Sequence, residues 1–127
     1  MSMWEHRDRA KQLINFDGLV DGKKYPTDID GLIEWKDRGF IFIECKRGGK
    51  ALPFGQQLAL ERLASGLTSA GKPSIVVVAE HDTNPSEDIE LADCQVRKLY
   101  WKGGWFKGDI GTTVRDIVAR YEDYLEA

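Results

Sequence analysis

The sequence predicts an α/β fold: a single domain over residues 1–127 in which a mixed β-sheet is flanked by helices. Two extended segments, 28–35 and 40–46, are separated by a short polar loop, as in a β-hairpin. Residues 53–70 have apolar side chains at helical spacing, and residues 74–79 form an apolar run typical of a strand buried on both faces. Since strand, helix and strand in this order favour parallel neighbours, the sheet is expected to combine antiparallel and parallel pairs.

Glycines and polar residues indicate where the chain reverses direction. The first hairpin is expected to turn within Lys36–Gly39, a polar stretch that ends in glycine. After a polar loop over residues 80–91, Cys94–Trp101 and Trp105–Lys107 predict a second hairpin, which turns at Gly103-Gly104. The chain therefore contains two predicted hairpins, one on each side of the central helix and strand.

Three amphipathic helices are predicted. The first covers residues 4–16, and the second covers residues 53–70, ending at Gly71 and Pro73. The last follows Thr113 and Asp116, which can form a capping pair. The apolar stripes comprise Ala10, Leu13 and Ile14 in the first helix; Leu60, Leu63, Ala64 and Leu67 in the second; and Val114, Ile117, Val118, Tyr121 and Leu125 in the last.

Composition limits the classes of function. The 18 Lys and Arg against 21 Asp and Glu give a net charge of −3, which argues against a protein that coats nucleic acid through bulk charge but permits a local basic patch. No apolar stretch approaches the roughly 20 residues that cross a membrane, and the N-terminus has no apolar signal-peptide run. Cys45 and Cys94 are isolated from other ligand types, so we expect free thiols in a reducing, cytoplasmic compartment.

The residues most informative about chemistry lie on the first predicted hairpin. Glu44 and Lys46 are two residues apart and share one face of their strand, as do Asp28 and Asp30 on the strand before it. Crowded carboxylates repel each other unless a cation neutralises them, and oxygen ligands favour Mg²⁺ or Mn²⁺. A metal-bound water beside a lysine provides the groups needed to hydrolyse a phosphodiester. A surface ion pair, or charges that protect an edge strand, would explain the same residues without catalysis.

The pattern of Asp30 followed by Glu44-Cys45-Lys46 resembles the PD-(D/E)xK nuclease superfamily. The segment Pro26–Ile33 is particularly similar to small phage and restriction-type members, including the Mrr-like and VRR-nuclease groups. The resemblance covers about residues 4–80 and implies a single restriction-endonuclease-like domain, with the C-terminal hairpin and helix as peripheral additions. Pro26-Thr27-Asp28 replaces the family's literal Pro-Asp dipeptide.

The resemblance implies a role for each matching residue. Asp30 would be the metal-binding aspartate, with Asp28 as the alternative or an assisting ligand. Glu44 would be the second ligand, Cys45 would contribute its backbone carbonyl to the metal, and Lys46 would be the catalytic lysine.

Further residues are implied by features that only some family members have. A glutamine on the helix after the Glu-x-Lys strand matches Gln56, which lies on the apolar stripe, or Gln57. A glutamate on the first helix would complete the metal site, and Glu5 is the candidate. Apart from the resemblance, Lys46, Arg47 and Lys50 form a local basic patch beside the site, and Arg47 and Lys50 are expected to contact DNA phosphates.

Two features of the second hairpin have two interpretations each. The basic residues Arg97, Lys98, Lys102 and Lys107 either contact phosphates or keep the turn soluble. The aromatic residues Trp101, Trp105 and Phe106 either stack on bases or pack against the C-terminal helix, and packing is the preferred interpretation.

The function implied is a Mg²⁺- or Mn²⁺-dependent DNA endonuclease, encoded by a phage or mobile element and acting in DNA processing or recombination in the host cytoplasm. A homodimer with one site for each DNA strand is one arrangement that such a small domain would allow. The alternative is a catalytically inactive nuclease-fold module that binds DNA or a protein partner. A third class is a structural domain in which Glu44 and Lys46 only form an ion pair.

Overall fold

The computed structural model describes residues 27–127. The helix predicted over residues 4–16 and the candidate ligand Glu5 lie outside the described residues. The elements in chain order are β1 (Gly31–Trp35), β2 (Gly39–Arg47), α2 (Phe54–Ser69), β3 (Ile75–His81), the short 3₁₀ helix η1 (Leu91–Asp93), β4 (Gln95–Trp101), β5 (Gly104–Lys107) and α3 (Val114–Glu126).

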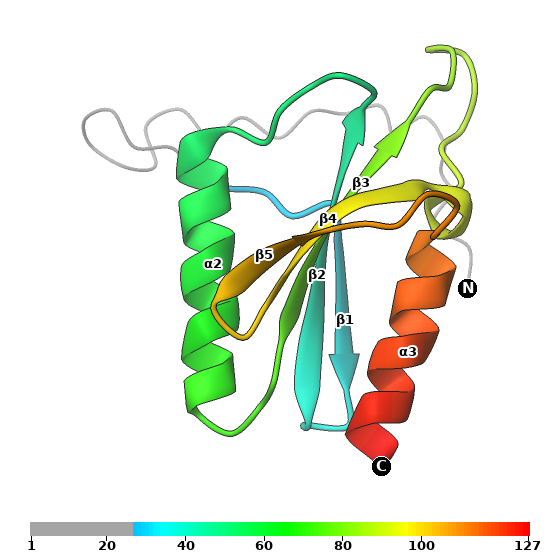
Figure 1. The fold of residues 1–127 in the computed structure, drawn as a ribbon. Coiled ribbons are helices and arrows are strands. Elements are labelled where there is room, and N and C mark those ends of the chain that lie inside the picture. The colour runs from blue at the N-terminus through cyan, green and yellow to red at the C-terminus, as the bar shows by residue number, and fades with distance from the viewer. Residues whose placement is uncertain (1–26) are drawn as a thin grey trace, which may run out of the picture.

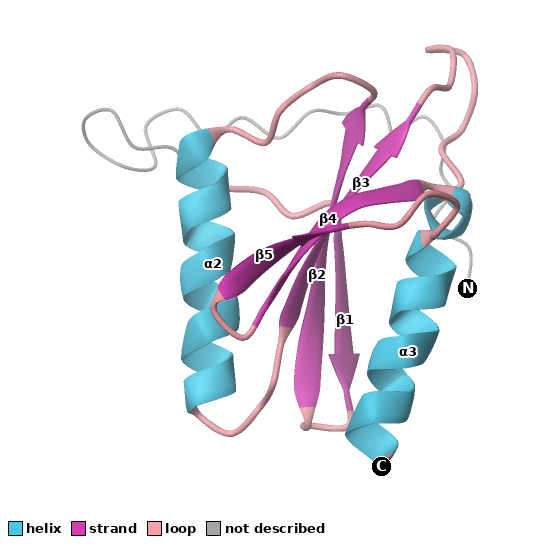
Figure 2. Cartoon of the chain, viewed as in Figure 1, coloured by secondary structure: helices cyan, strands magenta, loops and turns pink. Residues whose placement is uncertain are grey.

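The strands form one five-stranded sheet in the order β1-β2-β3-β4-β5 (Figures 1 and 2). β2 and β3, which are connected through α2, pair in parallel, and the other neighbours pair antiparallel. The predicted mixed sheet is thus confirmed. The second hairpin, however, is not peripheral: β4 pairs with β3 along most of its length and continues the central sheet.

The two described helices lie on opposite sides of the sheet (Figure 1). Side chains alternate between faces along each strand, so neighbouring residues of β2 and β3 enter different cores. Ile43 and Val77 pack in the core beneath α3, whereas Phe42 and Val76 pack in the core beneath α2. β3 is therefore buried on both faces, as its uniform apolar sequence predicts.

The first hairpin turns without a glycine at its centre. Lys36 and Asp37 occupy the two central positions with φ of 47° and 60°, the geometry of a hairpin turn that usually selects Asn or Gly. Gly39, expected to complete the turn, is already part of β2. A Cβ at Gly39 would overlap the hydroxyl of Tyr121 and lie 2.5 Å from the carbonyl oxygen of Pro73. This glycine is thus required for close packing and not for the turn.

Two predicted boundaries are wrong by a few residues. β1 begins at Gly31 and not at Asp28, so the two aspartates of interest precede the strand. The second hairpin turns at Lys102 and Gly103, both at positive φ, while Gly104 already pairs within β5.

The described helices follow the predicted patterns closely. Thr113 and Asp116 form the expected capping box at the start of α3. In α2, Leu60 and Ala64 are buried, but Leu63 is 45% exposed, so the stripe facing the sheet is narrower than predicted. Neither helix within residues 27–127 is long and apolar enough to span a membrane.

Candidate metal centre

Glu44 lies in the middle of β2 and is completely buried. Strand alternation turns its side chain toward α2, while the flanking Ile43 and Cys45 turn toward the core beneath α3. Burial of a carboxylate is costly unless it is protonated, paired or bound to a metal. This position therefore requires a chemical explanation.

Asp30 is placed beside Glu44 by the hairpin. Gly31 pairs with Ile43, so the same antiparallel register puts Asp30, the residue just before β1, opposite Glu44. The backbone N–H of Cys45 donates to Asp30 Oδ2 at 2.8 Å, which fixes the aspartate against β2. The two acidic residues that the sequence pattern connects are thus brought together.

Gln56, in the first turn of α2, joins the segments around this pair. Its side-chain amide Nε2 donates to Glu44 Oε1 and, at 3.2 Å, to the main-chain carbonyl of Asp28. Gln57 points elsewhere, since its Oε1 accepts a hydrogen bond from Lys98 Nζ at 3.1 Å. The structure therefore brings Gln56, and not Gln57, to Glu44, and it places Asp28 at the site through its backbone.

The second oxygen of Glu44, Oε2, is buried and has no hydrogen-bond partner within the described residues. Burial, as the largest cause, and the neighbouring Asp30 together raise the pKa of Glu44 from 4.5 to about 8. Lys46 opposes this shift with its positive charge. Without a cation, Glu44 thus holds a proton at neutral pH.

These groups fit a hard divalent ion better than a zinc ion. Within residues 27–127, no three His, Cys, Asp or Glu side chains converge to hold a metal. Mg²⁺ is commonly bound by one or two carboxylates with waters and substrate phosphates, whereas structural zinc requires four protein ligands. Asp30 and Glu44 supply two carboxylates, and the unpartnered Oε2 is the atom that a cation would satisfy.

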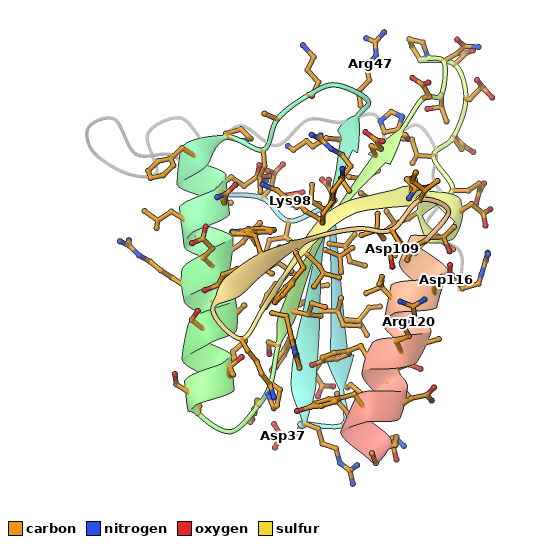
Figure 3. The ribbon with its side chains drawn as sticks, viewed as in Figure 1. Asp37, Arg47, Lys98, Asp109, Asp116 and Arg120 are labelled. Carbon is orange, nitrogen blue, oxygen red and sulfur yellow. The ribbon has the colours of Figure 1, made fainter. Side chains whose placement is uncertain are left out.

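Lys46 follows Glu44 on the same face of β2 and is partly buried. Its cross-strand partner in the parallel register is Glu80 of β3. Arg47 ends the strand and projects from the edge of the molecule where β2 leads toward α2 (Figure 3). Lys50 is exposed in the loop between β2 and α2. The predicted DNA-contacting residues therefore lie at the same end of the sheet as the carboxylates.

Residues from the second half of the chain also reach this face, and no short motif identifies them. Glu80 Oε2 lies 3.6 Å from Arg97 Nε, and Lys98 reaches the start of α2 through Gln57. Because side chains alternate along a strand, the sequence alone could have predicted that Glu80 lies on the same face of β3 as Val78. Arg97 and Lys98 reach this face because β4 pairs with β3, and no local sequence pattern predicts that pairing.

The cysteines are not isolated from each other. Cys45 Sγ and Cys94 Sγ lie 3.7 Å apart beneath α3, although both thiols are free. Burial raises the pKa of Cys45 to about 12, so its side chain is a protonated thiol. Because this side chain points away from Glu44, only the backbone of Cys45 faces the candidate site.

The aromatic residues of the second hairpin serve mainly in packing. Trp101 contacts Tyr121 of α3 edge-on, as the preferred interpretation predicts. Trp105 instead faces α2, where its indole N–H donates to Glu61 Oε2 at 3.1 Å. Phe106 is 54% exposed.

The chain matches no family model, no curated protein and no solved structure. The resemblance to the PD-(D/E)xK superfamily therefore stays a prediction from the residue pattern. What the chain can do is inferred from the geometry around Glu44.

Proposed function

We propose that this protein is a Mg²⁺- or Mn²⁺-dependent DNA endonuclease with a restriction-endonuclease-like domain. The observation that carries this proposal is the buried Glu44, whose Oε2 has no partner and whose carboxyl lies beside Asp30 and Lys46. A fully buried acid with an unsatisfied oxygen is expensive to maintain for structure alone. A site that binds a cation and an anionic phosphate accounts for that cost.

Each residue has a role that its position supports. Asp30, Glu44 and the backbone carbonyl of Cys45 would hold the ion, which supplies Lewis-acid activation of water and of the phosphate. Lys46 places a positive charge on the same strand face, where it stabilises negative charge on the phosphate. Gln56 orients Glu44 by donating to Oε1, which leaves Oε2 free for the metal.

The architecture is consistent with this assignment. The acidic residues lie on an antiparallel hairpin, α2 follows directly, and β3 pairs in parallel with the strand that carries Glu44 and Lys46. This order agrees with the core implied by the sequence resemblance. The free thiols of Cys45 and Cys94 fit the proposed location in a reducing cytoplasm, with phage or mobile-element DNA as the substrate source.

The test is cleavage of single-stranded, duplex and branched DNA with Mg²⁺ or Mn²⁺. We expect cleavage by the natural protein, loss of at least about a hundredfold in Lys46→Ala, and little change in Lys102→Ala, a matched lysine on the far hairpin turn. Cleavage that persists in Lys46→Ala would contradict the role of this lysine. A preparation that leaves every DNA intact would contradict the function.

The alternative function is a nuclease-fold module that binds DNA or a protein partner without cleaving DNA. For such a module, the net charge of −3 favours a protein partner over DNA. Calorimetry with Mn²⁺ separates the two. The enzyme should bind the ion and lose that affinity in Asp30→Asn, whereas a binding module has no need of the ion. The oligomeric state, for which we propose a homodimer, is measured by light scattering with and without DNA.

A further inference from the structure

We propose that Arg97, Lys98 and Lys107 form a phosphate strip that binds the DNA strand beside its cleavage point. The inference rests on the proposed function, because it extends the same site across the sheet. It differs from the basic patch at Arg47 and Lys50, which precedes α2 in the chain. Three features of the structure support it: the register of the strands, a β-bulge and the local charge.

The register places the strip in line with the candidate metal centre. Glu44 pairs with Val78, Val78 pairs with Lys98, and Lys98 pairs with Lys107, so one row of cross-strand partners runs from β2 to β5. Directly opposite residues project from the same face of a sheet. Three strand spacings of about 4.8 Å put the Lys107 backbone roughly 14 Å from that of Glu44, a span of a few nucleotides.

A β-bulge turns two consecutive cations toward this face. The pairing of β3 with β4 shifts between Val78 and Ala79, which pair with Lys98 and Val96 and leave Arg97 as the extra residue. In a regular strand, consecutive side chains would point to opposite faces. Here Arg97 Nε lies 3.6 Å from Glu80 Oε2, and its guanidinium donates to the main-chain carbonyl of Lys50. Bulges are often found where a side chain is re-aimed toward a site.

Lys98 is held by neutral partners. Its ammonium donates to Gln57 Oε1 at 3.1 Å and lies 4.4 Å from the centroid of the Trp105 ring. Among residues 27–127, neither Lys98 nor Lys107 forms a salt bridge, and Glu80 is the carboxylate paired with Arg97. The hollow of about 470 Å³ that these residues line is therefore positively charged, although the whole chain is acidic.

Charge complementarity selects the occupant. Within the described residues, the three cations have one carboxylate partner among them, and two of the three lie in the row that starts at the metal site. This arrangement matches the regularly spaced phosphates of a DNA strand. Lys102, on the same hairpin, does not belong to the strip, because its ammonium contacts the Tyr124 hydroxyl and the Trp101 ring on the α3 side. It provides a matched control.

The test measures affinity and its salt dependence for the full chain. Fluorescence anisotropy with a labelled duplex of about 20 base pairs, and with one of its strands alone, is recorded in Ca²⁺ between about 50 and 200 mM NaCl, and gels verify that the DNA stays intact. Lys107→Ala and Lys98→Ala should each weaken duplex binding about eightfold at about 0.1 M salt and reduce the salt slope by about 0.9. In cleavage, Lys107→Ala should raise KM and leave kcat unchanged.

Lys102→Ala should change affinity by less than about twofold, since it removes the same charge without a phosphate contact. Circular dichroism melting verifies that Lys98→Ala folds, and the exposed Lys107 tests the strip independently of packing. If the natural protein binds and cleaves DNA but all three variants behave alike, the phosphate strip is wrong and the proposed function stands. If the natural protein neither binds nor cleaves DNA, the proposed function fails first and the strip fails with it.

Discussion

Replacement of Glu44 by glutamine should make the metal-free protein more stable at neutral and alkaline pH. In the folded protein the pKa of Glu44 is raised from 4.5 to about 8, mainly by burial. Folding therefore favours the protonated carboxyl, and the native state binds one more proton than the unfolded state between these pH values. The stability that this carboxyl contributes is fully present below about pH 4.5 and is lost as pH rises to about 8.

The magnitude follows from the width of the window. Each pKa unit corresponds to about 1.4 kcal/mol, so the shift from 4.5 to about 8 costs the natural protein up to about 5 kcal/mol above pH 8. Glu44→Gln carries no ionisable group and avoids this loss. Its amide oxygen can still accept the hydrogen bond from Gln56, as Oε1 of the carboxyl does. We expect equal stabilities near pH 4.5 and a difference of several kcal/mol in favour of the variant above pH 8.

Urea unfolding in EDTA at a series of pH values measures this difference. Glu122→Gln, which makes the same substitution at a partly exposed position on α3, is the matched control. Adding Mn²⁺ should stabilise the natural protein by mass action and leave Glu44→Gln unaffected. Parallel stability curves for the natural protein and Glu44→Gln between about pH 4.5 and 8 would refute the reasoning about buried charge.

Three other predictions concern the site and its support. Gln56→Ala should weaken Mn²⁺ binding by about tenfold or more in calorimetry, because Glu44 loses its orienting donor, whereas equal losses in Gln56→Ala and Gln57→Ala would contradict this role. Thr113→Ala should lower the stability by about 1 kcal/mol in urea unfolding through loss of the capping box, and an unchanged midpoint would count against it. Gly39→Ala should destabilise by several kcal/mol because a Cβ overlaps Tyr121, whereas Gly55→Ala, in open space on α2, should stabilise by up to about 1 kcal/mol in the same assay.

Periodicity was sufficient to predict the local part of the candidate site. Glu44 and Lys46 share a face because strand side chains alternate, and Gln56 faces inward because it lies one helical turn before Leu60. Both rules depend only on neighbours in the sequence. The choice of Asp30 over Asp28 could not be made this way, because it depends on where β1 begins and on the bond from the Cys45 N–H.

Features that depend on distant segments were not predictable in the same way. The contact between Cys45 and Cys94 and the gathering of Arg97 and Lys98 near α2 both require the register of β4, including its bulge. A one-residue change in register would move these side chains to the other face. The hairpin turn within Lys36–Gly39 was predicted, but the positive φ angles of Lys36 and Asp37 were not, because Asn and Gly are the residues that usually occupy such positions.

The close packing around Gly39 has a consequence for how the chain folds. The residues proposed to hold the metal lie between Asp28 and Gln56, so they meet through a hairpin and the adjoining helix, with short loops to close. The contact of Tyr121 with the Pro73 carbonyl, by contrast, joins residues 48 positions apart. Since local contacts form before distant ones, we expect the carboxylate pair to assemble early and α3 to dock late. Mutations in α3 should then mainly accelerate unfolding, while mutations in the first hairpin should slow folding.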